Sequence, residues 1–209
     1  MIRAVVFDLG ETLVDETRQW TTVAEVLNVP VFTLMGVLGG VIERREDHRC
    51  LFDVLDARYI SFSERGYRHE LTDFYPDAVP TLRRLATDGF RLGIAGNQPQ
   101  GVAEDLRELE LPVELVASSA VWGVAKPDPA FFERIASDLG LPASEIAYVG
   151  DRLDNDVLPA QRAGMMGVFV RRGPWGYLHA GWPEAEEVQW RIDDLTQLPD
   201  VLSGFGRAT

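Results

Sequence analysis

The order of the apolar segments constrains the fold of this 209-residue chain more than any other feature. Short apolar runs, of the kind that form buried strands, occupy residues 4–7, 92–95, 115–117, 146–149 and 168–170. Segments with a helical spacing of apolar residues lie at residues 77–87, 101–109, 129–139 and 156–163. Such an alternation predicts a parallel sheet with helices on both faces. The expected class is therefore α/β, with a Rossmann-like, three-layer α/β/α core.

Residues 15–75 interrupt this alternation. The segment has helical patterns around residues 21–27, 31–42 and 51–59 and no good strand candidate. Tyr75 precedes a proline, which steers it out of helical conformation and marks the return to the core. We expect residues 15–75 to form an all-helical cap inserted into a core of residues 1–14 and 76–209. Further on, the aromatic residues within 173–183 predict an ordered loop.

Composition limits the partners of the chain. There are 20 basic and 33 acidic residues, and the formal net charge is −13. Nucleic-acid phosphates are bound by clustered basic side chains, so this balance argues against a nucleic-acid partner. The longest apolar run, residues 29–42, is shorter than the roughly 20 residues that span a bilayer, so no membrane segment is expected. With one cysteine and no signal-peptide pattern, a cytoplasmic protein is expected.

Four polar clusters lie where strands of the predicted sheet end or the next helix begins. They are Asp8-Leu9-Gly10-Glu11-Thr12, Gly96-Asn97-Gln98, Lys126-Pro127-Asp128-Pro129 and Gly150-Asp151-Arg152-Leu153-Asp154-Asn155-Asp156. Ligands of open parallel sheets bind at the carboxyl ends of the strands. Converging carboxylates with one lysine suit a hard cation and a phosphate group. Lys126 is the only lysine in the chain, and an arginine cannot replace a compact ammonium at a tight site.

In this order the clusters resemble the motifs of the haloacid dehalogenase (HAD) superfamily of aspartate-nucleophile hydrolases. The first motif is Phe7-Asp8 with Thr12-Leu13, and the third is Lys126-Pro127-Asp128-Pro129. The fourth, Val149-Gly150-Asp151 with Asp156 five residues later, is the most specific. The resemblance covers essentially the whole chain, including the helical cap. It implies a hydrolase, most often a Mg²⁺-dependent phosphatase of a small phosphorylated metabolite.

The resemblance also implies roles for individual residues. Asp8 is expected to be the nucleophile, to form an aspartyl-phosphate and to bind Mg²⁺. The main-chain carbonyl of Gly10 and the carboxylate of Asp151 are the other expected metal ligands. Asp156 is expected in the outer shell of the metal, and Lys126 is expected to orient Asp8 and stabilise the phosphoryl charge. Asp154, one residue off the motif, is expected to be exposed.

Two positions depart from the family pattern. Most phosphatases of the family have a general acid, a second aspartate, where this chain has Gly10. The neighbouring Glu11 is a candidate substitute acid, although a solvent-facing side chain is favoured. The second motif normally ends in a serine or threonine that binds phosphate, and this chain has Gly96 there. The backbone N–H groups of Gly96 and Asn97 and the Asn97 amide are then the expected phosphate donors, together with Lys126.

These departures leave two alternatives to a phosphatase. A metal-independent 2-haloacid dehalogenase also uses an aspartate nucleophile without the second aspartate. It needs a cationic group for the substrate carboxylate, for which Arg18 is only a candidate. The third reading is a weak or degenerate member of the fold that binds a phosphorylated ligand without turnover, because fold does not imply function.

Overall fold

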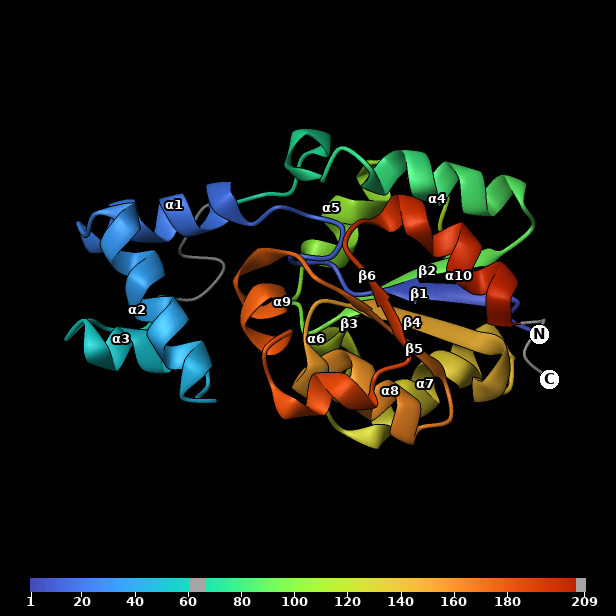
Figure 1. The fold of residues 1–209 in the computed structure, drawn as a ribbon. Helices are drawn as coiled ribbons and strands as arrows, with labels where there is room; N and C mark the ends of the chain where they lie inside the picture. The colour runs from blue at the N-terminus through green and yellow to red at the C-terminus, as the bar shows by residue number, and fades with distance from the viewer. Residues whose placement is uncertain (61–66, 206–209) are drawn as a thin grey trace.

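A six-stranded parallel sheet forms the centre of the molecule in the computed structural model, which describes residues 1–60 and 67–205 (Figure 1). The strands are β1 (Ala4–Phe7), β2 (Arg91–Gly96), β3 (Leu115–Ser118), β4 (Ile146–Gly150), β5 (Met166–Val170) and β6 (Trp190–Ile192). Their order is β3-β2-β1-β4-β5-β6, with β1 near the middle between β2 and β4. All five predicted strands are present, which confirms the expected parallel sheet.

Successive side chains of β1 point to opposite faces of the sheet and pack into two separate hydrophobic cores. Val5 and Phe7 join a hydrophobic cluster with α4 (Ala78–Thr87), α5 (Val102–Glu108) and α10 (Leu198–Phe205). Val6 joins a second cluster with α7 (Pro129–Leu139) and α8 (Leu158–Arg162) on the other face. The two helical layers lie above and below the sheet in Figure 1. The three-layer α/β/α class is therefore confirmed.

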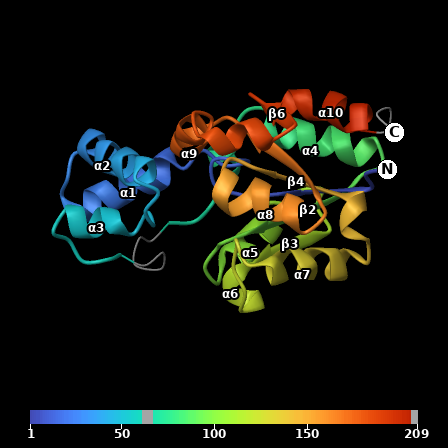
Figure 2. The same ribbon diagram turned by 60° about the horizontal axis from the view of Figure 1, so that its bottom comes forward.

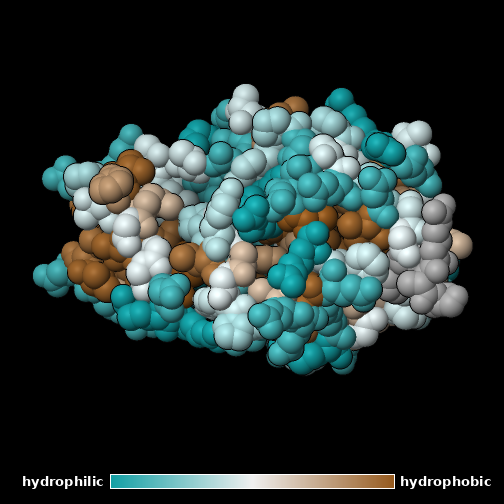
Figure 3. All heavy atoms as spheres, in the orientation of Figure 1, coloured by the Kyte–Doolittle hydropathy of each residue, from teal (hydrophilic) through white to brown (hydrophobic). Residues whose placement is uncertain are grey.

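Helices α1 (Thr17–Leu27), α2 (Val31–Glu43) and α3 (Cys50–Val54) share a hydrophobic cluster of their own. They gather at one end of the molecule in both views (Figures 1 and 2). Figure 3 shows hydrophobic side chains grouped on the surface of this end. The third predicted helix is shorter than expected, because the chain turns at Asp56, whose φ is 50°. Residues 61–66 of the expected cap and 206–209 of the expected core lie outside the described residues.

The segment between β5 and β6 was predicted as a loop, and this prediction is wrong. Residues Gly173–His179 form helix α9, which begins with Gly173 at a φ of 63° and a proline in its first turn. Pro174 suits the first turn of a helix because its missing N–H has no partner to lose there. The aromatic packing was correctly expected, since Trp175 joins the hydrophobic cluster of α1–α3.

Two other differences concern the regular structure. Strand β6 was not predicted, because a three-residue edge strand leaves little apolar pattern to detect. The predicted helix at 156–163 begins instead with a π-helical turn, Leu153–Val157, that runs into α8. The remaining elements are short: α6 (Ser119–Trp122) and the 3₁₀ turns Leu71–Asp73, Ala143–Glu145, Pro183–Glu187 and Leu195–Gln197.

Within the described residues, no single helix has the length and apolar composition to cross a membrane. Helices α1 and α2 meet the criterion only as a pair, and they are bent by 109° where they join.

Candidate active site

Most of the expected site residues line a cleft of about 1000 Å³ at the carboxyl ends of the strands, and Gly96 and Asp156 are not among its lining residues. Asp8, Lys126 and Asp151 contribute to its wall from the sheet side. Trp20 and Arg49 contribute from the side of α1–α3. The cleft therefore lies between the expected cap and the core.

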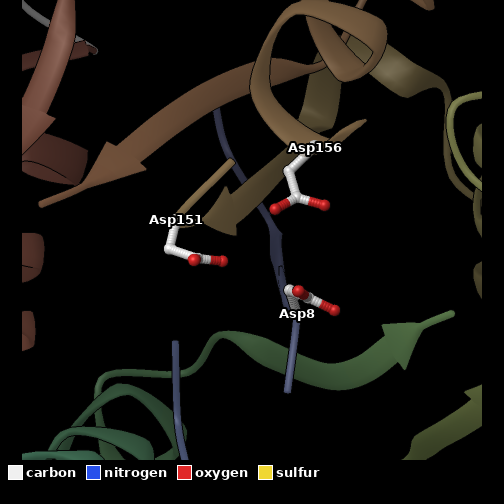
Figure 4. Close-up of side chains that lie close together, drawn as sticks. All are labelled: Asp8, Asp151 and Asp156. Carbon is white, nitrogen blue, oxygen red and sulfur yellow. The ribbon is translucent and has the colours of Figure 1, made fainter. Parts of the chain in front are cut away.

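The carboxylates of Asp8, Asp151 and Asp156 converge at the base of this cleft, where Asp156 is fully buried beneath the lining residues. Asp8 directly follows β1 and Asp151 directly follows β4, and these two strands are paired neighbours in the sheet. The Asp8 N–H donates to the Val149 carbonyl at 2.9 Å and so extends the strand pairing into the site. One carboxylate oxygen from each aspartate lies within 4.8 Å of the others, and Figure 4 shows the three carboxylates facing a common space.

Lys126 forms ion pairs with two of these carboxylates. Its Nζ lies 2.7 Å from Asp8 Oδ1 and 2.6 Å from Asp156 Oδ1. Burial opposes the charge of the ammonium, but Asp156 and Asp8 outweigh this effect and hold the pKa of Lys126 well above its ordinary value. Asp156 also accepts the Arg152 N–H through Oδ2, so both of its oxygens are engaged. Lys126 is therefore a fixed cation beside Asp8.

The donor set fits a divalent cation. Asp151 Oδ2 is buried with no hydrogen-bond donor among the described residues, and Asp8 Oδ1 is buried with the Lys126 ammonium as its ion-pair partner. Burial, followed by the charges of Asp156 and Asp8, raises the pKa of Asp151 well above its ordinary value. Buried carboxylate oxygens without partners are costly, and a hard cation with oxygen ligands removes that cost.

The Asn97 side chain, which follows β2, is hydrogen-bonded to the main chain of Lys126. The Asn97 amide donates to the Lys126 carbonyl at 2.8 Å, and Asn97 Oδ1 accepts the Lys126 N–H at 2.8 Å. The Asn97 side chain thus fixes the Lys126 segment, and phosphate binding by Gly96 and Asn97 stays a prediction. A Cβ atom on Gly96 would overlap Oδ1 of Asp8. Glycine at this position therefore leaves room for the Asp8 carboxylate.

Glu11 is buried, with 5% of its surface exposed, so the solvent-facing position expected for it is wrong. Its Oε2 accepts the Tyr75 hydroxyl at 2.5 Å and its Oε1 accepts the Glu16 N–H at 3.0 Å. Its side chain lies against Gly173, where a Cβ atom would overlap it. Burial raises the pKa of Glu11, while these hydrogen bonds oppose the shift. Glu11 is a structural bridge between β1 and the segments around Tyr75 and Gly173.

Sequence reasoning also missed residues that support the site. Tyr148 donates its hydroxyl to the Ala95 carbonyl at 2.7 Å, and its ring lies 5.5 Å from Lys126 Nζ. Thr12 is fully buried, with its hydroxyl 3.5 Å from Asp151 Oδ1. The position of Thr12 in the first motif was a usable signal, whereas Tyr148 had none beyond its place in a buried strand. Asp154 is exposed as expected and pairs with Arg152 at 2.8 Å.

The sequence model of the haloacid dehalogenase-like hydrolases matches residues 2–164. The chain therefore belongs to this family of hydrolases.

Similar proteins have been named by their reactions. A glyceraldehyde 3-phosphate phosphatase of Methanopyrus kandleri is 42% identical over 133 residues, which are 61% of this chain and 56% of that protein. A phosphoglycolate phosphatase of Pseudomonas savastanoi pv. phaseolicola is 31% identical over 94% of this chain and 78% of its own length. The crystal structure of 2-haloacid dehalogenase from Pseudomonas syringae pv. Tomato DC3000 superimposes with a TM-score of 0.62 at 26% identity, covering 98% of this chain and all of that one.

Proposed function

We propose that this hydrolase is a Mg²⁺-dependent phosphatase of a small phosphorylated metabolite, with Asp8 as its nucleophile. The observation that carries the proposal is the buried set of Asp8, Asp151 and Asp156, in which Asp8 and Asp156 contact the ammonium of Lys126. A haloacid substrate brings no phosphoryl group, and its hydrolysis by an aspartate nucleophile does not require a set of carboxylates that can hold a cation. The phosphatases among the similar proteins support the same assignment.

The carboxylates of Asp8 and Asp151 and the main-chain carbonyl of Gly10 would hold the Mg²⁺. Bound there, the cation would screen the negative nucleophile from the negative phosphoryl group. Asp156, whose two oxygens already accept hydrogen bonds from Lys126 and Arg152, would act from the outer shell and fix Lys126 in place.

The reaction begins with Asp8. An oxygen of its carboxylate attacks phosphorus, the bond from phosphorus to the leaving oxygen breaks, and an aspartyl-phosphate forms. Lys126 orients Asp8 and stabilises the charge of the transferred phosphoryl group. Water then attacks the same phosphorus, the bond to the Asp8 oxygen breaks, and inorganic phosphate leaves.

We propose that residues 15–75 form the cap that selects the substrate. They supply Trp20 and Arg49 to the wall of the cleft opposite Asp8. The similar phosphatases are named for glyceraldehyde 3-phosphate and phosphoglycolate, which are phosphate esters of two or three carbon atoms. A substrate of this size class is the first to test.

The dehalogenase alternative needs a free cation for the substrate carboxylate, and Arg18 does not supply it. Its Nε donates to Asp73 Oδ1 at 2.7 Å and its Nη2 to Asp73 Oδ2 at 2.5 Å. Nη2 also donates to the Arg68 carbonyl at 2.6 Å. The Arg18 guanidinium is therefore already hydrogen-bonded to other groups within residues 15–75.

A panel of short phosphate esters, assayed with Mg²⁺ and with excess chelator, tests the function. We expect turnover with Mg²⁺, loss with chelator, and loss in Asp8→Asn, whose amide is neither a nucleophile nor an anionic ligand. Release of halide from a 2-haloacid in the presence of chelator would establish the dehalogenase. Binding of the esters without any turnover would establish the binding protein.

A further inference from the structure

The space beside Gly10, where the family usually has its general acid, contains another carboxyl group. A Cβ atom built on Gly10 would overlap Oε1 of Glu16 and lie 2.8 Å from its Cδ. The three atoms nearest to that position all belong to Glu16. Gly10 does not have a left-handed backbone, so its conformation does not itself call for glycine. The obstacle to a side chain at residue 10 is the Glu16 carboxyl group.

Glu16 is held in this position by hydrogen bonds of both its main chain and its side chain. It immediately precedes α1, and its N–H donates to Glu11 Oε1 at 3.0 Å. Its Oε2 accepts the indole N–H of Trp20 at 3.1 Å, one helical turn later. Trp20 is itself buried, with its ring 6.4 Å from that of Trp175. The carboxyl group is therefore aimed at the space beside Gly10, and Glu16 lines the same cleft as Asp8.

The two glutamates near Gly10 differ in what surrounds them. Glu11 also lines the cleft, but its Oε2 accepts the Tyr75 hydroxyl and its side chain is packed against Gly173. Glu16 has its Oε1 at the point from which a side chain of residue 10 would extend. Of the two, Glu16 has the geometry of a substitute for a residue-10 acid.

We propose that Glu16 is the general acid and general base of this enzyme, an assignment that rests on the phosphatase function proposed above. As Asp8 attacks phosphorus, the protonated Glu16 carboxyl gives its proton to the leaving oxygen, which departs as a neutral alcohol. The Glu16 carboxylate then takes a proton from water as that water attacks the aspartyl-phosphate. Phosphate is released, Asp8 is regenerated, and Glu16 again carries its proton.

Leaving-group dependence separates this function from a structural one. Glu16→Gln keeps an acceptor for the Trp20 indole but has no proton of carboxylic acidity. General acid catalysis contributes about 10²–10⁴-fold, so we expect Glu16→Gln to slow alkyl phosphates by that factor and aryl phosphates far less. The ratio of alkyl to aryl rates in one preparation does not depend on how much of the variant is folded. Equal losses on both esters would overturn the proposal.

Glu11→Gln is the matched comparison, because it changes the other carboxyl group beside residue 10. We expect it to alter alkyl and aryl rates by one common factor. A selective loss on alkyl phosphates in Glu11→Gln, without one in Glu16→Gln, would transfer the function to Glu11 and refute the assignment.

A rescue experiment tests the same geometry from the other side. Gly10→Asp alone places its side chain onto the Glu16 carboxyl group, and we expect it to lose alkyl phosphatase activity. Adding Glu16→Ala removes the overlap and frees residue 10 to carry the acid. We expect the double variant to recover alkyl phosphatase activity above both single variants, and lower activity than in both would contradict the proposal. Mg²⁺- and Asp8-dependent hydrolysis of aryl phosphates by the natural protein is the separate check on the phosphatase function.

Discussion

Gly96 and Asp8 lie so close that a Cβ atom on Gly96 would overlap Oδ1 of the Asp8 carboxylate. That same oxygen is 2.7 Å from Lys126 Nζ. The absence of a side chain at residue 96 is therefore part of how the Asp8–Lys126 pair is accommodated. A hydroxyl residue at this position would add a phosphate donor and displace the nucleophile.

Gly96→Ala is expected to lower kcat by about 10²-fold, because displacement of a reacting group by about 1 Å has effects of that size. Gly96→Ser is also expected to be slower than the natural protein, although its hydroxyl offsets part of the loss. Steady-state kinetics on one aryl phosphate measure both variants. Gly93→Ala, on the same strand and away from Asp8, is the comparison for strand packing. A faster Gly96→Ser enzyme would show that the hydroxyl matters more than the room for Asp8.

Lys126→Arg is expected to reduce kcat by about 10²-fold or more, although it conserves charge. Lys126 is 4% exposed, and its ammonium lies between Asp8 and Asp156, where a planar guanidinium does not fit. Arg134→Lys, in an exposed pair with Asp138, is the matched control and is expected to leave kcat unchanged. Near-normal kcat in Lys126→Arg would show that the reaction does not depend on the Lys126 ammonium.

Mg²⁺ is expected to raise the thermal unfolding midpoint, because it binds the native carboxylate cluster and not the unfolded chain. At a concentration about 100 times Kd, the stabilisation is about 2.7 kcal/mol, or roughly 5–10 °C in Tm for a domain of this size. Asp151→Asn should abolish the shift, while Asp154→Asn, on the exposed carboxylate, should retain it. An undiminished shift in Asp151→Asn would place the cation elsewhere.

His179 is expected to make stability depend on pH. Burial lowers its pKa from 6.5 to about 4, and its Nδ1 accepts the Leu153 N–H at 3.1 Å. Because the folded pKa lies below the unfolded one, this stabilisation is complete above about pH 6.5 and is lost as the pH falls toward 4. From pH 7 to pH 5 the loss from this group is about 2 kcal/mol.

Urea unfolding of the natural protein and His179→Gln at these two pH values checks this expectation. Glutamine keeps an acceptor for Leu153 but does not titrate. The unfolding free energy of the natural protein should therefore fall by about 2 kcal/mol more than that of the variant. Parallel changes in the two proteins would mean that His179 does not titrate on unfolding.

The core and the convergence of Asp8, Lys126 and Asp151 were predictable for a physical reason. Buried strands have a distinct apolar pattern, and the ends of parallel strands meet at one edge of the sheet. The positions of Asp8 and Asp151 directly after β1 and β4 were therefore enough to predict that their side chains lie close together. Helix α9 was not predictable in this way, since its Gly and Pro content is typical of a loop.

The contacts that assign functions to individual polar residues were beyond sequence reasoning. Glu11 is buried by Tyr75, which lies 64 residues away, and Asn97 is engaged by Lys126, which lies 29 residues away. Glu16 had no motif to mark it, because its relation to Gly10 depends on how the first turn of α1 folds back on the loop after β1. Contacts between residues so far apart in the chain produce no local pattern in the sequence.

Helix α9 has a practical consequence for exchanging specificity between related enzymes. Trp175 and Leu178, far along the chain from α1–α3, complete the hydrophobic cluster of those helices. If residues 15–75 alone were grafted onto a related enzyme, they would lose their contacts with Trp175 and Leu178. They would instead pack against the α9 of the recipient, which has a different sequence. Chimeras that transfer α9 together with residues 15–75 should remain folded where simple transplants aggregate, so the unit of modular exchange in this enzyme is discontinuous.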